Sequence, residues 1–110
     1  MTPDDFRQIA LAIPGTVESS HLNQPNFRLD GRIYASMGSP DFDSALVKLT
    51  PEQQLPLVER GDGVYRPASG NWGRSGYTVI RLSCVAIDEM REVLEKSAQN
   101  AQPRPRQIAA

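Results

Sequence analysis

The segment YRPASGNWGRSGYTVIRL, at residues 65–82, combines the residue types that contact phosphates and nucleobases. It contains no aspartate or glutamate, so its cations have no acidic neighbour within the segment. Guanidinium groups bind phosphate oxygens, and aromatic rings stack on the bases of flexible or single-stranded nucleic acids. The candidate contact residues in this segment are Arg66, Trp72, Arg74, Tyr77 and Arg81.

Trp72 has a second interpretation, because it stands between Gly70, Gly73 and Gly76 and just before an expected strand. Glycines adopt the positive-φ conformations of tight turns, and a large indole often closes one end of a core. We favour this core interpretation, which predicts that Trp72→Ala costs about 3 to 5 kcal/mol. It is partly compatible with the first, because Arg74 can still be exposed at the tip of the turn.

A second set of cations lies on expected strands: Arg28, Arg32 and Lys48. Alternation of side chains places them on the face opposite Phe27, Ile33 and Val47, where they would line one side of a sheet together with Arg81 if the strands are neighbours. Strand faces that touch water also carry such residues, so an ordinary solvated face is the alternative.

Little in the sequence indicates catalysis. His21 is the only histidine and falls in an expected loop, where a lone imidazole is usually a surface group; an enzymatic pocket of His21 with Tyr34 and Trp72 is the least favoured alternative. Cys84, the only cysteine, is expected to be a small buried hydrophobe at the end of a strand. No phosphate-loop, dinucleotide-binding or zinc-protease motif occurs. We therefore expect a protein that is not an enzyme and that has no cofactor and no metal site.

The elements that carry these residues can be predicted from periodicity and capping. A helix is expected from Thr2-Pro3-Asp4-Asp5 to about Ile13, a hairpin at 26–29 and 32–37 around Asp30-Gly31, a strand at 45–49, a helix start at Thr50-Pro51-Glu52-Gln53, a brief strand at 64–66, a long strand at 77–84 and a helix at 87–101. Alternation buries Ala35 and Met37 and exposes Tyr34. Pro56 should kink the second helix or reduce it to a short turn.

This order predicts an α+β domain in which helices pack on one face of an antiparallel sheet of about four to five strands. The chain has 110 residues, which suits one domain, placed at 1–101 and followed by a mobile tail at 102–110 that contains two prolines. A single cysteine, an acidic N-terminal segment and the lack of a long apolar run indicate a soluble, cytoplasmic protein, which we expect to be a monomer.

Three stretches, PNFRLDGRIYASM, ALVKLTPEQQ and YRPASGNWGRSGYTVIRL, resemble the MmcQ/YjbR family of small bacterial proteins over nearly the whole chain. The most specific pieces are Pro25-x-Phe27-Arg28, the run from Lys48 to Pro51, and Trp-Gly-Arg-x-Gly from Trp72 to Gly76. The resemblance implies a frataxin-like, double-wing fold, and family members are commonly labelled DNA-binding by structural analogy. The chain departs from the family pattern at Pro56 and at Tyr77, where the family often has an indole.

These observations predict a non-enzymatic binding module for nucleic acid (DNA). The alternative is a small protein-interaction or ligand-sensing domain that uses the same surface on an acidic partner. Because the net charge is −1, the chain as a whole has no attraction for nucleic acid or for a membrane. Whether it binds nucleic acid therefore depends on the local arrangement of its cations. The predicted contact residues are Arg28, Arg32, Lys48, Arg66, Trp72, Arg74, Tyr77 and Arg81.

Overall fold

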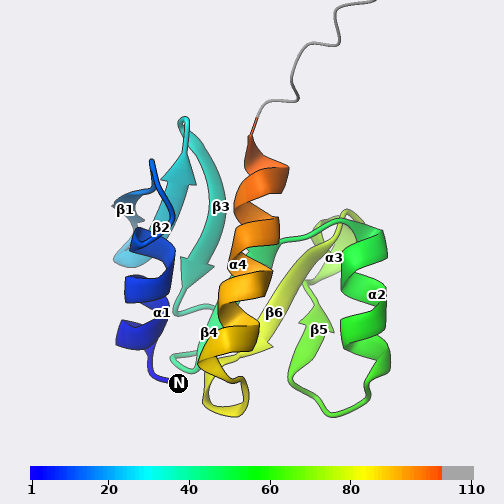
Figure 1. Ribbon diagram of the computed structural model, residues 1–110. Helices are drawn as coiled ribbons and strands as arrows, with labels where there is room; N and C mark the ends of the chain where they lie inside the picture. Colours follow the sequence, from blue (N-terminus) through cyan, green and yellow to red (C-terminus); the bar gives the residue numbers. More distant parts are fainter. Residues whose placement is uncertain (103–110) are drawn as a thin grey trace, which may run out of the picture.

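Figure 1 shows the computed structural model of the chain, in which residues 1–102 are described. The elements, in chain order, are α1 (Pro3–Leu11), β1 (Val17–His21), β2 (Gln24–Leu29), β3 (Arg32–Met37), β4 (Ser44–Lys48), α2 (Pro51–Glu59), β5 (Tyr65–Pro67), α3 (Gly70–Arg74), β6 (Tyr77–Arg81) and α4 (Ile87–Ala101). No helix in this part of the chain is long and apolar enough to cross a membrane. The tail predicted to be mobile lies, from residue 103 on, outside the described residues.

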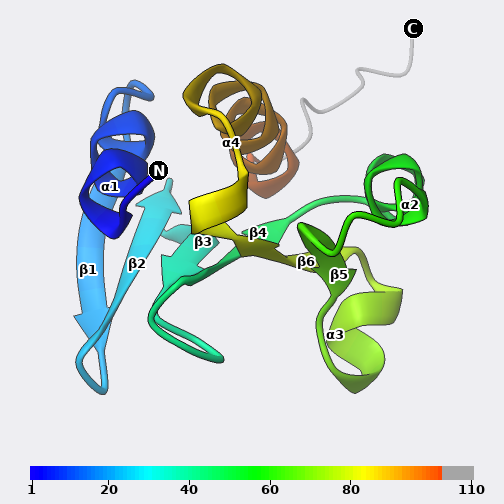
Figure 2. The ribbon, with the colours of Figure 1, turned by 90° about the horizontal axis from the view of Figure 1, so that it is seen from below.

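The strands form one antiparallel sheet of six, in the order β1-β2-β3-β4-β6-β5. The predicted α+β class is confirmed, with a somewhat larger sheet than expected. Figure 2 shows α1, α4 and α2 on one side of the sheet, and the core lies between them and the strands. The short helix α3 and the loop between β3 and β4 extend on the opposite side.

Local signals fix most of the element starts. Thr2 and Thr50 each form the predicted capping box, in which the hydroxyl accepts from the backbone N–H three residues on and that residue's side chain accepts from the threonine N–H. Asp30 and Gly31 both have positive φ, as a two-residue hairpin turn requires. Pro56 does not reduce this element to a short turn, because α2 continues through it to Glu59. Pro56 removes the N–H that would donate to the Glu52 carbonyl, and both residues lie on the exposed side of the helix.

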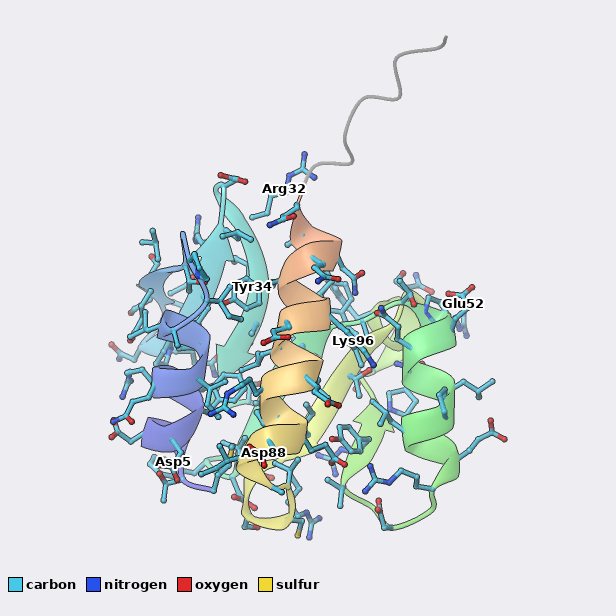
Figure 3. All side chains as sticks on the ribbon, viewed as in Figure 1. Asp5, Arg32, Tyr34, Glu52, Asp88 and Lys96 are labelled. Carbon is cyan, nitrogen blue, oxygen red and sulfur yellow. The ribbon has the colours of Figure 1, made fainter. Side chains whose placement is uncertain are left out.

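Tyr34 is buried, although alternation predicted that it faces solvent. The reason is a β-bulge: Phe27 pairs with Ala35 while the next residue, Arg28, pairs with Ile33, so that Tyr34 is the extra residue of β3. Ile33 therefore shares the outer face with Arg28 and is 44% exposed. The Tyr34 side chain extends on the helix-covered side of the sheet (Figure 3), where its hydroxyl meets Ala10 of α1 and Thr16. Its burial raises the pKa of the phenol.

Two further segments differ from the sequence prediction. Residues 17–21 form the edge strand β1, which had been expected to be a loop, and the turn to β2 has positive φ at Leu22 and Asn23. That turn lacks the Asn-Gly or Asp-Gly signal, and β1 has no apolar alternation to identify it. β6 ends at Arg81 and is followed by a 3-10 turn, Leu82–Cys84. Because the chain leaves the sheet there, Cys84 is exposed, and the prediction of a buried cysteine is wrong.

Candidate nucleic-acid interface

Figure 2 shows the face of the sheet that α1, α2 and α4 leave open, with the β1–β2 turn and α3 at its two sides. Residues next to that turn and on α3 line a hollow on this face. This hollow, which we call the basic groove, has a volume of about 550 Å³, within the usual range for ligand sites. Its lining residues are His21, Gln24, Asn26, Arg28, Gly31, Arg32, Ile33, Ser36, Leu46, Lys48, Trp72 and Tyr77.

The basic groove has cations and no carboxylate in its lining. Among residues 1–102, Arg28, Arg32 and Lys48 take part in no ion pair, and Arg28 instead donates from Nε to Asn26 Oδ1 at 3.1 Å. Arg28 on β2 and Lys48 on β4 are separated by β3, which places their backbones about 10 Å apart across the sheet. The groove is therefore a concentration of positive charge that the protein does not neutralise itself.

Trp72 is 63% exposed, so the core interpretation of this residue is wrong. The indole contacts Tyr77 edge to face, with ring centroids 4.8 Å apart and planes at 80°. The physical reason lies in α3, which contacts the chain behind it through Gly73: a Cβ there would come within 2.0 Å of the carbonyl oxygen of Ala68. Because Gly73 occupies the inner side of this short helix, the neighbouring Trp72 projects over the open face of the sheet.

The position of α3 relative to β6 is fixed by Gly76 and Gln54. Gly76 has φ +108°, and a Cβ at this residue would meet the Leu49 carbonyl oxygen at 2.0 Å. Gln54 of α2 donates from Nε2 to the carbonyl oxygens of Gly73 (3.2 Å) and Tyr77 (3.0 Å). These contacts hold both aromatic rings at one end of the basic groove.

The backbone of Lys48 is held from the other side of the sheet by α4. The Ser97 hydroxyl accepts from the Lys48 N–H at 2.8 Å and donates to the Tyr34 carbonyl oxygen at 2.6 Å. Asn100 donates from Nδ2 to the Lys48 carbonyl oxygen at 2.9 Å. Both peptide groups of Lys48 are thus fixed, while its side chain lines the groove. In the sequence, Ser97 and Asn100 carry no signal that identifies this role.

The structure brings together five of the eight predicted contact residues: Arg28, Arg32, Lys48, Trp72 and Tyr77. Arg32 contributes at the rim only, because it pairs with Leu29, whose side chain is buried on the helix side of the sheet. Figure 3 shows Arg32 at the end of its hairpin.

The other three predicted residues lie elsewhere. Arg66 and Arg81 line a separate hollow of about 340 Å³ together with Asp41 and Asp43. Arg74, at the end of α3, donates to Asn71 Oδ1 at 3.3 Å. None of these three arginines lines the basic groove, although Arg66 also lines a hollow that adjoins the groove at Trp72.

His21 lines the basic groove, although it was not among the contact residues predicted from the sequence. Tyr34 hydrogen-bonds to the Thr16 hydroxyl at 2.8 Å and donates to the Ala10 carbonyl oxygen at 3.3 Å on the helix side of the sheet. His21 and Tyr34 are thus on opposite faces, and the catalytic pocket considered from the sequence does not form. Within residues 1–102, no three His, Cys, Asp or Glu side chains come together as metal ligands would.

Fold and site together define a small α+β domain whose antiparallel sheet has one face covered by helices and one open face that carries a cationic groove. No family model matches the chain, and no curated protein matches it. The solved structures that are similar to it in fold include the following two. One is the crystal structure of Deinococcus radiodurans protein DR2400, with the family-model domain DUF419: TM-score 0.72, 20% identity, over 87% of this chain and 75% of that one. The other is a Pseudomonas syringae protein: TM-score 0.70, 18% identity, over 93% of this chain and 100% of that one.

Proposed function

We propose that the protein is a non-enzymatic module that binds nucleic acid in the basic groove. The observation that carries this proposal is the composition of the groove. Its lining contains two arginines and one lysine, no aspartate or glutamate, and the exposed indole of Trp72. Phosphates would neutralise the cations with release of bound counterions, and the aromatic pair offers a surface for a base. The DNA-binding label that the resemblance to the MmcQ/YjbR family implies agrees with this proposal.

The salt dependence of binding follows from the number of cations in the groove. If Arg28, Arg32 and Lys48 each contact one phosphate, the slope of log affinity against log salt is about −2.7 on duplex DNA and about −2.1 on a single strand. Because the net charge of the chain is −1, binding should be weak, and titrations must start at about 50 mM salt or less.

The test compares two double variants that remove the same charge from opposite sides of the molecule. Arg28→Gln with Lys48→Gln changes the basic groove. Arg91→Gln with Lys96→Gln changes exposed positions on α4, which lies on the helix-covered side of the sheet (Figure 2). Fluorescence anisotropy with labelled DNA oligonucleotides measures the affinity. We expect the groove variant to reduce the magnitude of the salt slope by about 1.4 to 1.8, and the α4 variant to change it little.

Two results would refute the proposal. One is equal loss of affinity in both variants, which would show that only net charge matters. The other is the absence of any wild-type binding to single- or double-stranded oligonucleotides at about 100 μM protein and about 50 mM salt, where even non-specific complexes form.

A second candidate function is the recognition of an acidic protein partner by the same face. The observation in its favour is that Leu22, in the β1–β2 turn, is 82% exposed and Phe42, in the β3–β4 loop, is 85% exposed, and both loops extend on the open side of the sheet (Figure 2). Apolar side chains at the border of a charged surface are typical of protein interfaces. Loss of oligonucleotide binding in a Leu22→Ser, Phe42→Ser double variant would tie these residues to nucleic acid instead.

A further inference from the structure

A second hollow adjoins the basic groove at Trp72. It has a volume of about 660 Å³, and Pro40, Leu46, Arg66, Pro67, Trp72 and Val79 are among its lining residues. We call it the Trp72 hollow. Trp72 and Leu46 line both hollows, so that the indole stands at their common border.

The Trp72 hollow differs from the basic groove in chemistry. Its lining is mainly apolar, Arg66 is its one charged residue, and no carboxylate takes part. The basic groove therefore suits the phosphates of a ligand, whereas the neighbouring hollow suits a flat apolar ring attached to them.

The indole has a surface free for stacking. In an edge-to-face pair, the edge of one ring meets one face of the other, so Tyr77 covers at most one face of Trp72. The large exposed fraction of Trp72 agrees with this geometry. A base that enters the Trp72 hollow can therefore lie against the indole while its phosphates remain near Lys48 and Arg28.

We infer that the ligand is single-stranded nucleic acid and that one unpaired base enters the Trp72 hollow and stacks on Trp72. This inference rests on the proposed function and specifies its ligand class. In a duplex the bases are stacked on one another and present only their edges, so a hollow with an exposed indole would stay unused. A free mononucleotide has the same base and phosphate chemistry, but it would engage only a part of the cationic groove.

Trp72 is the only tryptophan, so its fluorescence reports stacking directly. The full chain is titrated with a ten-nucleotide single strand of mixed sequence, the same sequence as a duplex, an abasic strand with the same phosphates, and a mononucleotide. We expect the single strand to quench Trp72 and to bind about 5- to 150-fold more tightly than the abasic strand, which is the range for loss of one stacked base. We expect the duplex and the mononucleotide to bind more weakly and to cause little quenching.

A pair of variants at the two ends of α3 separates the hollow from general electrostatics. Ser69 lines the Trp72 hollow and its side chain caps nothing, whereas Ser75 is exposed beyond α3 and lines neither hollow. Ser69→Glu should weaken single-strand binding more than Ser75→Glu, although both add one negative charge. Trp72→Leu should reduce single-strand affinity, measured by anisotropy, to that of the abasic strand.

The outcomes distinguish the two proposals. Equal affinities for the single, duplex and abasic strands would overturn the base-stacking inference and leave the proposed function intact. A mononucleotide that binds as tightly as the single strand would overturn the inference that the ligand is a strand. If none of the probes binds, the proposed function is refuted, and this inference is refuted with it.

Discussion

Replacement of Ser97 by alanine tests how α4 supports the strand that carries Lys48. Ser97 is fully buried, and its hydroxyl bonds to the Lys48 N–H and to the Tyr34 carbonyl oxygen. Tyr34 is the extra residue of the bulge in β3, and the β3–β4 ladder ends at the pair Ala35 and Val47. The hydroxyl thus satisfies two backbone groups at the irregular end of the ladder.

The expected cost follows from these two groups. Ser97→Ala leaves one donor and one acceptor without a partner, at about 1 to 3 kcal/mol each, while alanine gains about 0.5 kcal/mol in helix propensity. We expect the free energy of unfolding to fall by about 1.5 to 5.5 kcal/mol, a large part of the stability of an ordinary domain.

Urea unfolding followed by far-UV circular dichroism measures this change. The midpoint should fall while the denaturant slope stays the same, because the surface exposed on unfolding is unchanged. Gln99→Ala, at an exposed position of the same helix, is the control and should stay within about 0.5 kcal/mol of wild type. A loss of less than about 1 kcal/mol in Ser97→Ala would show that water or a local shift satisfies both groups, and would refute the reasoning.

Three further predictions concern stability. Trp72→Ala should lower the free energy of unfolding, measured in urea, by no more than about 1.5 kcal/mol, the contribution of the aromatic pair with Tyr77. A loss above about 3 kcal/mol would show that the indole is buried in the core. Gly76→Ala should prevent folding or lower the melting temperature strongly, because the new Cβ would lie 2.0 Å from the Leu49 carbonyl oxygen and alanine rarely adopts this φ. A melting temperature like that of wild type would contradict this close approach. Burial and the 2.6 Å bond to Glu89 raise the pKa of Tyr65, so the folded state keeps the phenol proton where the unfolded chain loses it. The contribution of Tyr65 to the free energy of unfolding should therefore be fully present below about pH 10 and decline above it. A Tyr65→Phe variant whose stability declines in the same way would exclude Tyr65 as the source.

Capping, turn chemistry and periodicity predicted much of the fold from the sequence, because each depends on residues a few positions apart. Thr2 and Thr50 form their capping boxes within three residues, and Asp30-Gly31 adopts its turn by local backbone preference. The last helix has the predicted bounds, since its apolar stripe repeats over four turns. The placement of Arg28 and Lys48 on one face also followed from the alternation of strands.

Tertiary structure alone decided what depends on residues far apart in the chain. The bulge at Tyr34 changed which side chains of β3 face the core, and its carbonyl finds a partner 63 residues away in Ser97. The exposure of Trp72 depends on the approach of Gly73 to Ala68 and on Gln54 from another helix. Arg81 is absent from the groove because it pairs with Ser44 at the far end of β4, whereas Tyr77 of the same strand pairs with Lys48. A sequence pattern reports the preference of each segment for a conformation, whereas the distance between two segments is set by how their surfaces pack together.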